Sequence, residues 1–360
     1  MLRKLAKTGV AAALHWSGAE RLLAARAGAK NAPIVIGYHR VVDDFRAHAR
    51  RTLAPMLISA RTFERHLDWL GRRFAFVTLA DVAAWAEGAR RFERPAVAIT
   101  FDDGYADLYH HGFPVLARKG IPAAVFVVTD LVGTARLQNH DELHLLLSSM
   151  YAQSRGARRV LERLTGLALA APVLDALRRA AADPARLAAA LLETLSQAQI
   201  HPLARALRAD AALSPLMREE LRALSWDMLA RMVRAGFTIG SHTRTHARLT
   251  RESWQSVVAE TNGSRAAIEQ KLNTRVEHFA YPGGDFNASV VRTVAAAGYR
   301  CAYTSCRHRD RAYPALTIPR WLLWERSCLD AFERFSPALM SCQLSGVFDF
   351  ARPCKQAHAS

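Results

Sequence analysis

The sequence is poor in cysteine, in acidic residues and in long apolar runs, and each shortage excludes a class of protein. Its five cysteines all follow residue 300 and form no tight pattern, which argues against a disulfide framework and fits a reducing compartment. No run of about 18 apolar residues occurs, so no membrane-spanning helix is expected. Lys and Arg (49) outnumber Asp and Glu (32). Because these basic residues are scattered and not interleaved with aromatics, we interpret them as solvated and expect no nucleic-acid partner.

What is present is enough apolar material for a sizeable core. Hydrophobic residues make up 51% of the 360-residue chain, which excludes general disorder. Short apolar runs alternate with helical patterns; the clearest runs are 34–37, 95–101, 123–128, 237–240, 276–280 and 299–304. Such repeated strand–helix units predict an α/β fold with a parallel sheet, either open or closed into a barrel.

Residues 137–224 break this rhythm, since they are rich in Ala, Leu and Arg and lack strand-like runs. We interpret this stretch as a helical insertion between two strands. The predicted organisation is an N-terminal segment 1–32, a first part of the main domain 33–136, the insertion 137–224, a second part 225–335 and a peripheral C-terminal segment 336–360.

The N-terminal segment resembles the start of a signal peptide only in its basic residues Arg3, Lys4 and Lys7. Its apolar stretch is broken by His15, and no convincing cleavage site follows, so we expect no signal peptide and a cytoplasmic location. The pattern predicts a basic amphipathic helix, which either docks on the domain or contacts the inner membrane peripherally.

Two polar motifs follow predicted strands. Thr100-Phe101-Asp102-Asp103-Gly104 places two carboxylates at a strand end, where adjacent side chains diverge and can serve different partners in one pocket; the alternative is a surface turn. In Ser241-His242-Thr243-Arg244-Thr245-His246 the histidines are four residues apart, so a helical turn would bring both imidazoles to one ion. Two imidazoles and one carboxylate are a common ligand set for a catalytic divalent metal.

The carboxyl ends of parallel strands share one edge, where active sites are built. Four polar strand ends would meet there, beginning at Tyr38-His39, Asp102-Asp103, His242 and Tyr281-Pro282-Gly283-Gly284. This convergence makes a metal-dependent hydrolase the leading function class.

The first two motifs, together with Phe279-Ala280-Tyr281-Pro282-Gly283-Gly284, resemble the motifs of the NodB-homology polysaccharide deacetylases, over residues 33–135 and 225–325. The resemblance implies an irregular (β/α) barrel that removes acetyl groups from N-acetylated glycans, with a divalent metal that is often zinc. It implies Asp103, His242 and His246 as metal ligands, Asp102 as general base and His39 as proton donor. It also implies substrate contacts from Tyr281, Pro282 and Gly283, with a backbone N–H near Tyr281 for the oxyanion.

The chain departs from this pattern in two ways. Many members carry an Arg at the start of the third motif, where this sequence reads Glu277-His278-Phe279, and no late Leu-x-His motif is found. Arg320 is the candidate replacement for that Arg, the alternative being a surface salt bridge. Trp321 is a candidate sugar contact, the alternative being packing. Two further functions stay open: an O-acetyl glycan esterase, or a glycan-binding member without activity.

Overall fold

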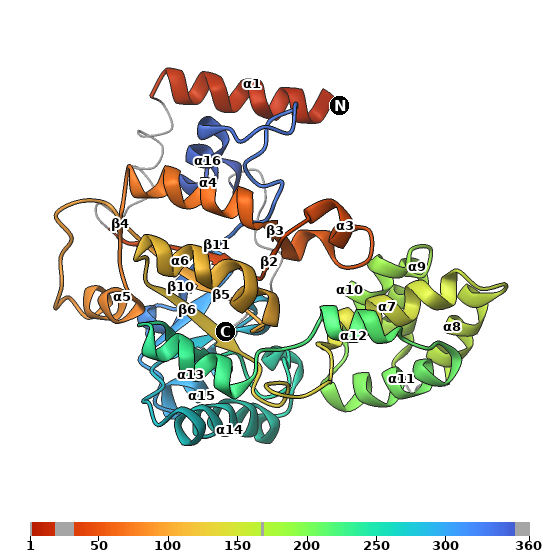
Figure 1. Cartoon of the computed structure of the whole chain (residues 1–360). Coiled ribbons are helices and arrows are strands. Elements are labelled where there is room, and N and C mark those ends of the chain that lie inside the picture. Colours follow the sequence, from red (N-terminus) through yellow and green to blue (C-terminus); the bar gives the residue numbers. More distant parts are fainter. Residues whose placement is uncertain (1, 19–31, 167–168, 350–360) are drawn as a thin grey trace.

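A computed structural model describes residues 2–18, 32–166 and 169–349. Its centre is a nine-stranded sheet in which all the strand pairs are parallel (Figure 1). In spatial order the main strands are β10 (Ile318–Pro319), β9 (Cys301–Thr304), β8 (His278–Ala280), β7 (Thr238–Ser241), β6 (Ala123–Val127), β5 (Ala96–Phe101), β1 (Ile34–Tyr38) and β11 (Trp321–Leu322). The short β4 (Ala75–Phe76) pairs with β5 beside this path.

One segment, 318–322, brings the two edges of the sheet together. Its first half, β10, pairs with β9, and its second half, β11, pairs with β1. The N–H of Arg320 donates to Thr304 O and the N–H of Leu323 donates to Gly37 O. The result is a nearly closed parallel β/α barrel, which confirms the expected fold class.

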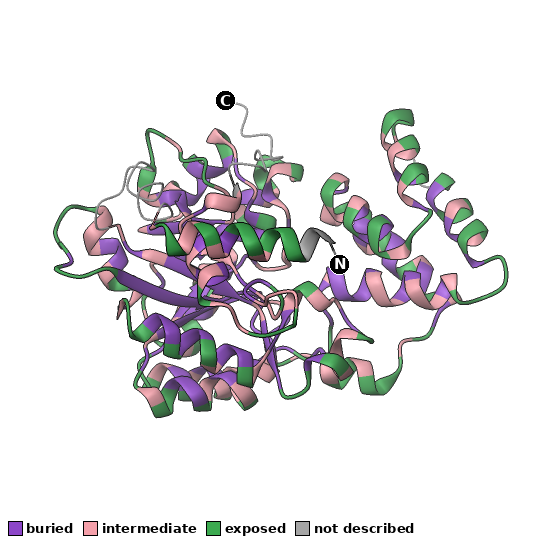
Figure 2. Ribbon diagram, turned by 90° about the horizontal axis from the view of Figure 1, so that it is seen from above, coloured by how far each residue is buried: buried purple, intermediate pink, exposed green. Residues whose placement is uncertain are grey.

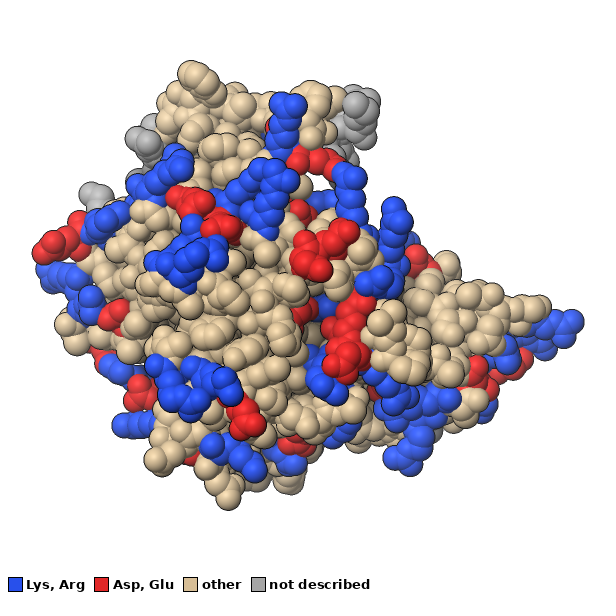
Figure 3. Space-filling model, viewed as in Figure 1, with Lys and Arg blue, Asp and Glu red and all other residues tan. Residues whose placement is uncertain are grey.

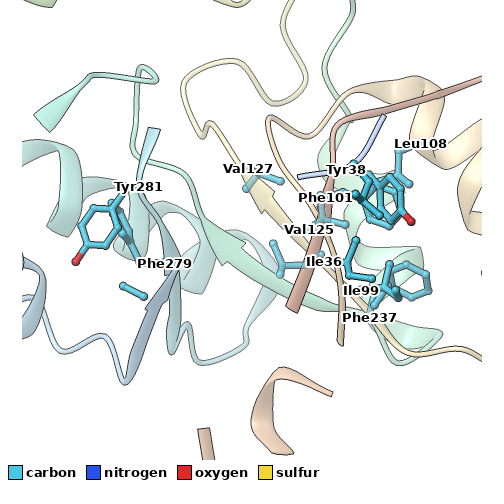
Figure 4. Packing of buried hydrophobic residues seen from close by; sticks show 14 of the residues in the cluster. Ile36, Tyr38, Ile99, Phe101, Leu108, Val125, Val127, Phe237, Phe279 and Tyr281 are labelled. Carbon is cyan, nitrogen blue, oxygen red and sulfur yellow. The ribbon is translucent and has the colours of Figure 1, made fainter. Parts of the chain in front are cut away.

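The strands pack on both faces, as their continuous apolar sequences predict. All six residues of β5 are buried. The largest hydrophobic cluster includes Ile36, Ile99, Val125 and Phe279, which come from four different strands (Figure 4). Helices cover the sheet outside: α4 (Ala60–Gly71), α5 (Leu79–Ala86), α6 (Phe113–Lys119), α13 (Trp226–Arg234), α14 (Trp254–Leu272) and α15 (Ala288–Ala296).

The regular elements described within 137–224 are all helices. They are α7 (Asn139–Tyr151), α8 (Gly156–Thr165), α9 (Ala171–Ala180), α10 (Pro184–Thr194), α11 (Gln197–Asp210) and α12 (Pro215–Glu220). The first five contribute to a hydrophobic cluster of their own, built around residues such as Leu146, Leu191 and Leu203. This lobe projects to one side of the barrel (Figure 1).

Several short elements complete the chain. A second, two-stranded sheet joins β2 (Arg40–Val42) to β3 (Leu57–Ser59), near the short helix α3 (Phe45–Ala49); the sequence patterns did not predict this pair. Helix α1 (Leu2–Trp16) packs on α16 (Pro337–Leu344) at the top of the view in Figure 1. Residues 19–31 of the predicted N-terminal segment lie outside the described part. No helix of the described residues has the length and apolar character needed to cross a bilayer.

Candidate active site

Three side chains converge where β5 and β7 end. The Oδ1 atom of Asp103 lies 3.6 Å from Nε2 of His242 and 3.2 Å from Nε2 of His246. One ligand atom from each residue falls within 4.8 Å of the other two. The carboxylate and both imidazoles can therefore reach a single cation, as the motif spacing predicts.

The hydrogen bonds of this cluster fit a metal ion. Asp103 is buried, and its Oδ1 atom has no hydrogen-bond partner. Nδ1 of His242 lies 2.8 Å from the carbonyl oxygen of Ala280. Because a carbonyl can only accept, Nδ1 carries the proton, and the lone pair of Nε2 faces Asp103. Burial lowers the pKa of His242 to about 4, which keeps this lone pair available near neutral pH.

A loop, and not the helical turn expected from the sequence, brings the two histidines together. Residues 242–248 after β7 contain no helix, and Thr243 and His246 have φ values of 67° and 60°. A non-glycine residue in the left-handed backbone region costs free energy, and it persists where contacts with its surroundings stabilise it. Glu260 of α14 stabilises this loop, because its carboxylate accepts hydrogen bonds from the N–H groups of Arg244 and Thr245 at 2.7 and 2.9 Å. The motif spacing gave no signal for Glu260.

Asp102 lies beside the cluster and pairs with Arg320. Nη1 and Nη2 of Arg320 donate to Oδ1 and Oδ2 of Asp102, each over 2.7 Å, and both side chains are buried. Burial alone would raise the pKa of Asp102, but the charge of Arg320 and its hydrogen bonds hold the pKa below its ordinary value. Of the two alternatives for Arg320, the structure shows the buried pair with Asp102.

One pocket of about 220 Å³ collects most of the predicted site residues. From the barrel its lining includes His39, Asp102, Asp103, His242, His246, Tyr281, Gly283 and Arg320. His39 follows β1, and Tyr281 and Gly283 follow β8, so four strand ends meet at this edge. Pro282 and Trp321 are not part of this lining.

This geometry agrees with what the chain is similar to. The family model described as "Polysaccharide deacetylase" matches residues 89–166 and 175–302, which is more than half of the chain. The chain belongs to the polysaccharide deacetylase family. The match confirms the resemblance carried by the three motifs.

The chain matches only part of the length of each curated relative. A poly-beta-1,6-N-acetyl-D-glucosamine N-deacetylase of Staphylococcus epidermidis is 29% identical over 118 residues, which span 31% of this chain and 40% of the relative. A putative polysaccharide deacetylase of Bacillus subtilis, YxkH, is 30% identical over 77 residues, 21% of this chain and 28% of the relative.

Two solved structures share the fold. The deacetylase PplD of Streptococcus pyogenes, in complex with acetate, has a TM-score of 0.54 and 16% identity, over 87% of this chain and 97% of that structure. IcaB from Ammonifex degensii has a TM-score of 0.54 and 18% identity, over 88% and 98%. These likenesses support the barrel architecture of the chain.

Tyr281 supports the pocket wall through bonds within the fold. Its N–H donates to Tyr303 O at 3.0 Å and its hydroxyl donates to Leu316 O at 2.9 Å. Neither donor is left for a substrate, so the N–H expected for the oxyanion is not that of Tyr281. Pro282 is buried and has no N–H to offer.

Trp321 belongs to another cavity, which corrects the expectation that it contacts substrate. That cavity is also lined by Ile34 and Pro95 and shares no lining residue with the pocket that contains Asp103, His242 and His246. Successive side chains of an extended segment point to opposite faces. Arg320 and Leu322 face the pocket that contains Asp103, so the intervening Trp321 points away from it.

One pocket residue that the sequence patterns did not indicate is His140, which α7 brings to the pocket. Its Nε2 atom lies 3.9 Å from Oδ2 of Asp103 and 2.7 Å from the hydroxyl of Tyr105. The Tyr105 hydroxyl donates to Asp141 at 2.6 Å, so His140 must donate its Nε2–H to Tyr105. Nδ1 is then the unprotonated nitrogen, and burial lowers the pKa of His140, which favours this neutral form.

Further hydrogen bonds join the helical lobe to the two segments that carry Asp103 and His246. Gln138 donates from its side-chain amide to Asp103 O at 3.0 Å, and Gln197 donates to His246 O at 3.3 Å. The lobe also lines the pocket with Leu192, Leu195, Gln197 and Ile200. The only sequence signal for these residues was their place in the insertion, since their contacts depend on how the lobe docks.

Proposed function

We propose that this chain is a metal-dependent hydrolase that removes acetyl groups from N-acetylated sugars of a polysaccharide or oligosaccharide. The observation that carries the proposal is the Asp103–His242–His246 cluster with the ionised Asp102 beside it in one pocket. The N-deacetylase name of the staphylococcal relative supports the substrate class, although this chain matches only 40% of that protein's length.

Asp103, His242 and His246 would hold a divalent cation, for which the nitrogen and oxygen donors suit zinc. When bound, the ion supplies Lewis-acid polarisation of the acetamide carbonyl and acidifies water. The hydrogen bond from Nδ1 of His242 to Ala280 O fixes the orientation of the imidazole ring, whose Nε2 atom would face the cation.

Asp102 would accept the proton of the attacking water. A general base must be ionised before it acts, and the lowered pKa of Asp102 meets this requirement. The two-point contact with Arg320 also fixes the direction of the carboxylate, so the base is positioned before substrate binds.

His39 would donate a proton to the departing amine. It lines the same pocket as Asp102 and the metal cluster, but it follows a different strand end, β1. Acid and base could thus act on one substrate from separate elements. This assignment rests on the resemblance of Tyr38-His39-Arg40-Val41 to members whose acid histidine follows the first strand.

The test measures acetate release from N-acetylglucosamine oligomers and from O-acetylated glycans, with and without a chelator. Asp103→Ala and His242→Ala are expected to lose bound metal and acetate release together. Asp68→Ala and His110→Ala, at exposed positions outside the pocket, are the matched controls. Full activity of either site variant with the metal still bound would refute the proposal. Release from O-acetylated substrates alone would favour an esterase, and glycan binding without release would favour a non-catalytic member.

A further inference from the structure

Helix α1 exposes apolar residues on one side between residues 5 and 16. Leu5, Val10 and Trp16 are 43%, 54% and 89% exposed, and they are three of the seven large hydrophobic side chains exposed in the described part of the chain. Ala6, Gly9 and Ala13 are exposed between them. Spacings of three and four residues place these positions on one side of the helix. Figure 2, which views this end of the molecule, shows the exposed side of α1 facing outward.

The opposite face of α1 attaches the helix to the body. Ala11 is fully buried in a small cluster with Leu339 and Cys342 of α16, against which Leu14 also packs. The Lys7 ammonium lies 4.7 Å from the ring centroid of Phe348. This packing orients α1 so that the side with Leu5, Val10 and Trp16 stays exposed.

The size of this face argues against a second copy of the chain as its partner. A helix of 15 residues is about 22 Å long, and one side of it offers a few hundred Å² at most. A stable protein dimer buries about 800 Å² on each partner. The face of α1 alone is therefore too small to hold a dimer together.

The charge of the segment favours an anionic partner. Residues 1–16 contain Arg3, Lys4 and Lys7 and no acidic residue, and the whole chain has a net charge of +17. Two such helices would repel each other, whereas both would be attracted to acidic headgroups. On the face that Figure 3 shows, the end of the molecule that carries α1 has few acidic side chains. A tryptophan at the end of an apolar helix face is typical of helices that lie in the headgroup region.

We propose that α1 docks the protein on the surface of a membrane that contains anionic lipids, with Leu5, Val10 and Trp16 inserted among the headgroups. The helix lies in the plane of the surface, and its contact with α16 carries the barrel with it. This proposal does not depend on the reaction at the metal site.

The test is co-sedimentation of the full chain with vesicles of phosphatidylcholine, alone or mixed with phosphatidylglycerol. The chain is expected to bind the mixed vesicles. The variant L5Q/V10Q/W16Q is expected to bind at least about tenfold more weakly, because affinity scales with the apolar area inserted. The matched control, L216Q/W254Q/F332Q, removes three apolar side chains that are 64%, 64% and 70% exposed on other parts of the chain, and it is expected to bind like the unaltered chain.

Trp16→Gln alone provides a milder variant, and circular dichroism checks that each variant folds. The proposal is overturned if the unaltered chain ignores both kinds of vesicle, or if L5Q/V10Q/W16Q binds as tightly as the control. It is also overturned if light scattering without lipid shows a dimer that the α1 variants convert to monomers, since a second copy would then occupy this face.

Discussion

Arg320 donates hydrogen bonds to both carboxylate oxygens of Asp102, although the two residues lie 218 positions apart in the sequence. The guanidinium comes from the segment that joins β10 to β11 and closes the barrel. The third motif has Glu277-His278-Phe279 where many family members carry an Arg. In this chain the closing segment supplies the charge beside Asp102, so barrel closure and the orientation of this carboxylate depend on the same residues.

Replacing Arg320 with Gln should raise the pKa of Asp102, because the burial that remains favours the neutral acid. Asp102 would then take up its proton at a higher pH than in the unaltered chain. The acidic limb of the kcat/KM profile should therefore move to higher pH. Arg320→Lys keeps a positive charge and should shift the limb less, while losing the two-point contact.

The comparison is the pH dependence of kcat/KM for the unaltered chain and both Arg320 variants. Arg118→Gln, which removes an exposed guanidinium paired with Glu64, serves as the control and should leave the profile in place. An acidic limb that stays unmoved in Arg320→Gln would mean that Asp102 is not the group that titrates.

His140 is expected to contact the substrate and not the metal, because it lies outside the group of ligand atoms within 4.8 Å of one another. His140→Ala should therefore lower kcat/KM about tenfold while the metal content stays complete. Tyr105→Phe removes the group that fixes the His140 tautomer and should give a smaller loss. His144→Ala, one turn further along α7, is the control. Loss of metal in His140→Ala would instead make this residue a ligand.

Glu260 should contribute to metal affinity without touching the ion. Its carboxylate holds the backbone between His242 and His246, so Glu260→Ala releases a loop with two left-handed residues. Loss of such supporting bonds typically weakens metal binding by about 10- to 100-fold. Competition with a chelating dye measures this change. Glu269→Ala, further along the same helix, should bind metal like the unaltered chain; equal affinity of the two variants would contradict the role.

The sequence was informative where function depends on strand ends. Asp102, Asp103 and His242 each follow a strand, and the parallel arrangement alone brings such positions to one edge. The loop geometry of His246 was predicted wrongly because a four-residue spacing fits a helical turn equally well. Nothing in the local pattern distinguishes the two, since the bonds from Glu260 that hold the loop come from a separate helix.

Other features depend on contacts that no local pattern encodes. His140 reaches the pocket only because the helical lobe docks through Gln138 and Gln197 on the segments that carry Asp103 and His246. The direction of the Trp321 side chain depends on which alternate residues of the extended segment 318–322 face the pocket. Both outcomes require the tertiary arrangement, which explains why the sequence suggested a sugar contact at Trp321 and none at His140.

The buried His66 should make the barrel sensitive to acid, independently of the metal. It is fully buried beside Tyr38, whose hydroxyl lies 3.1 Å from its Nδ1 atom, and burial lowers its pKa from 6.5 to about 3. Between these values the unfolded chain binds a proton that the folded chain does not, so stability falls as pH falls. The loss should approach about 3 kcal/mol near pH 4. Urea unfolding in the presence of chelator, at about pH 7 and about pH 4, measures it. In His66→Gln this part of the pH dependence should disappear, whereas exposed His110→Gln should retain it; an unchanged dependence in His66→Gln would show that other groups cause the acid sensitivity.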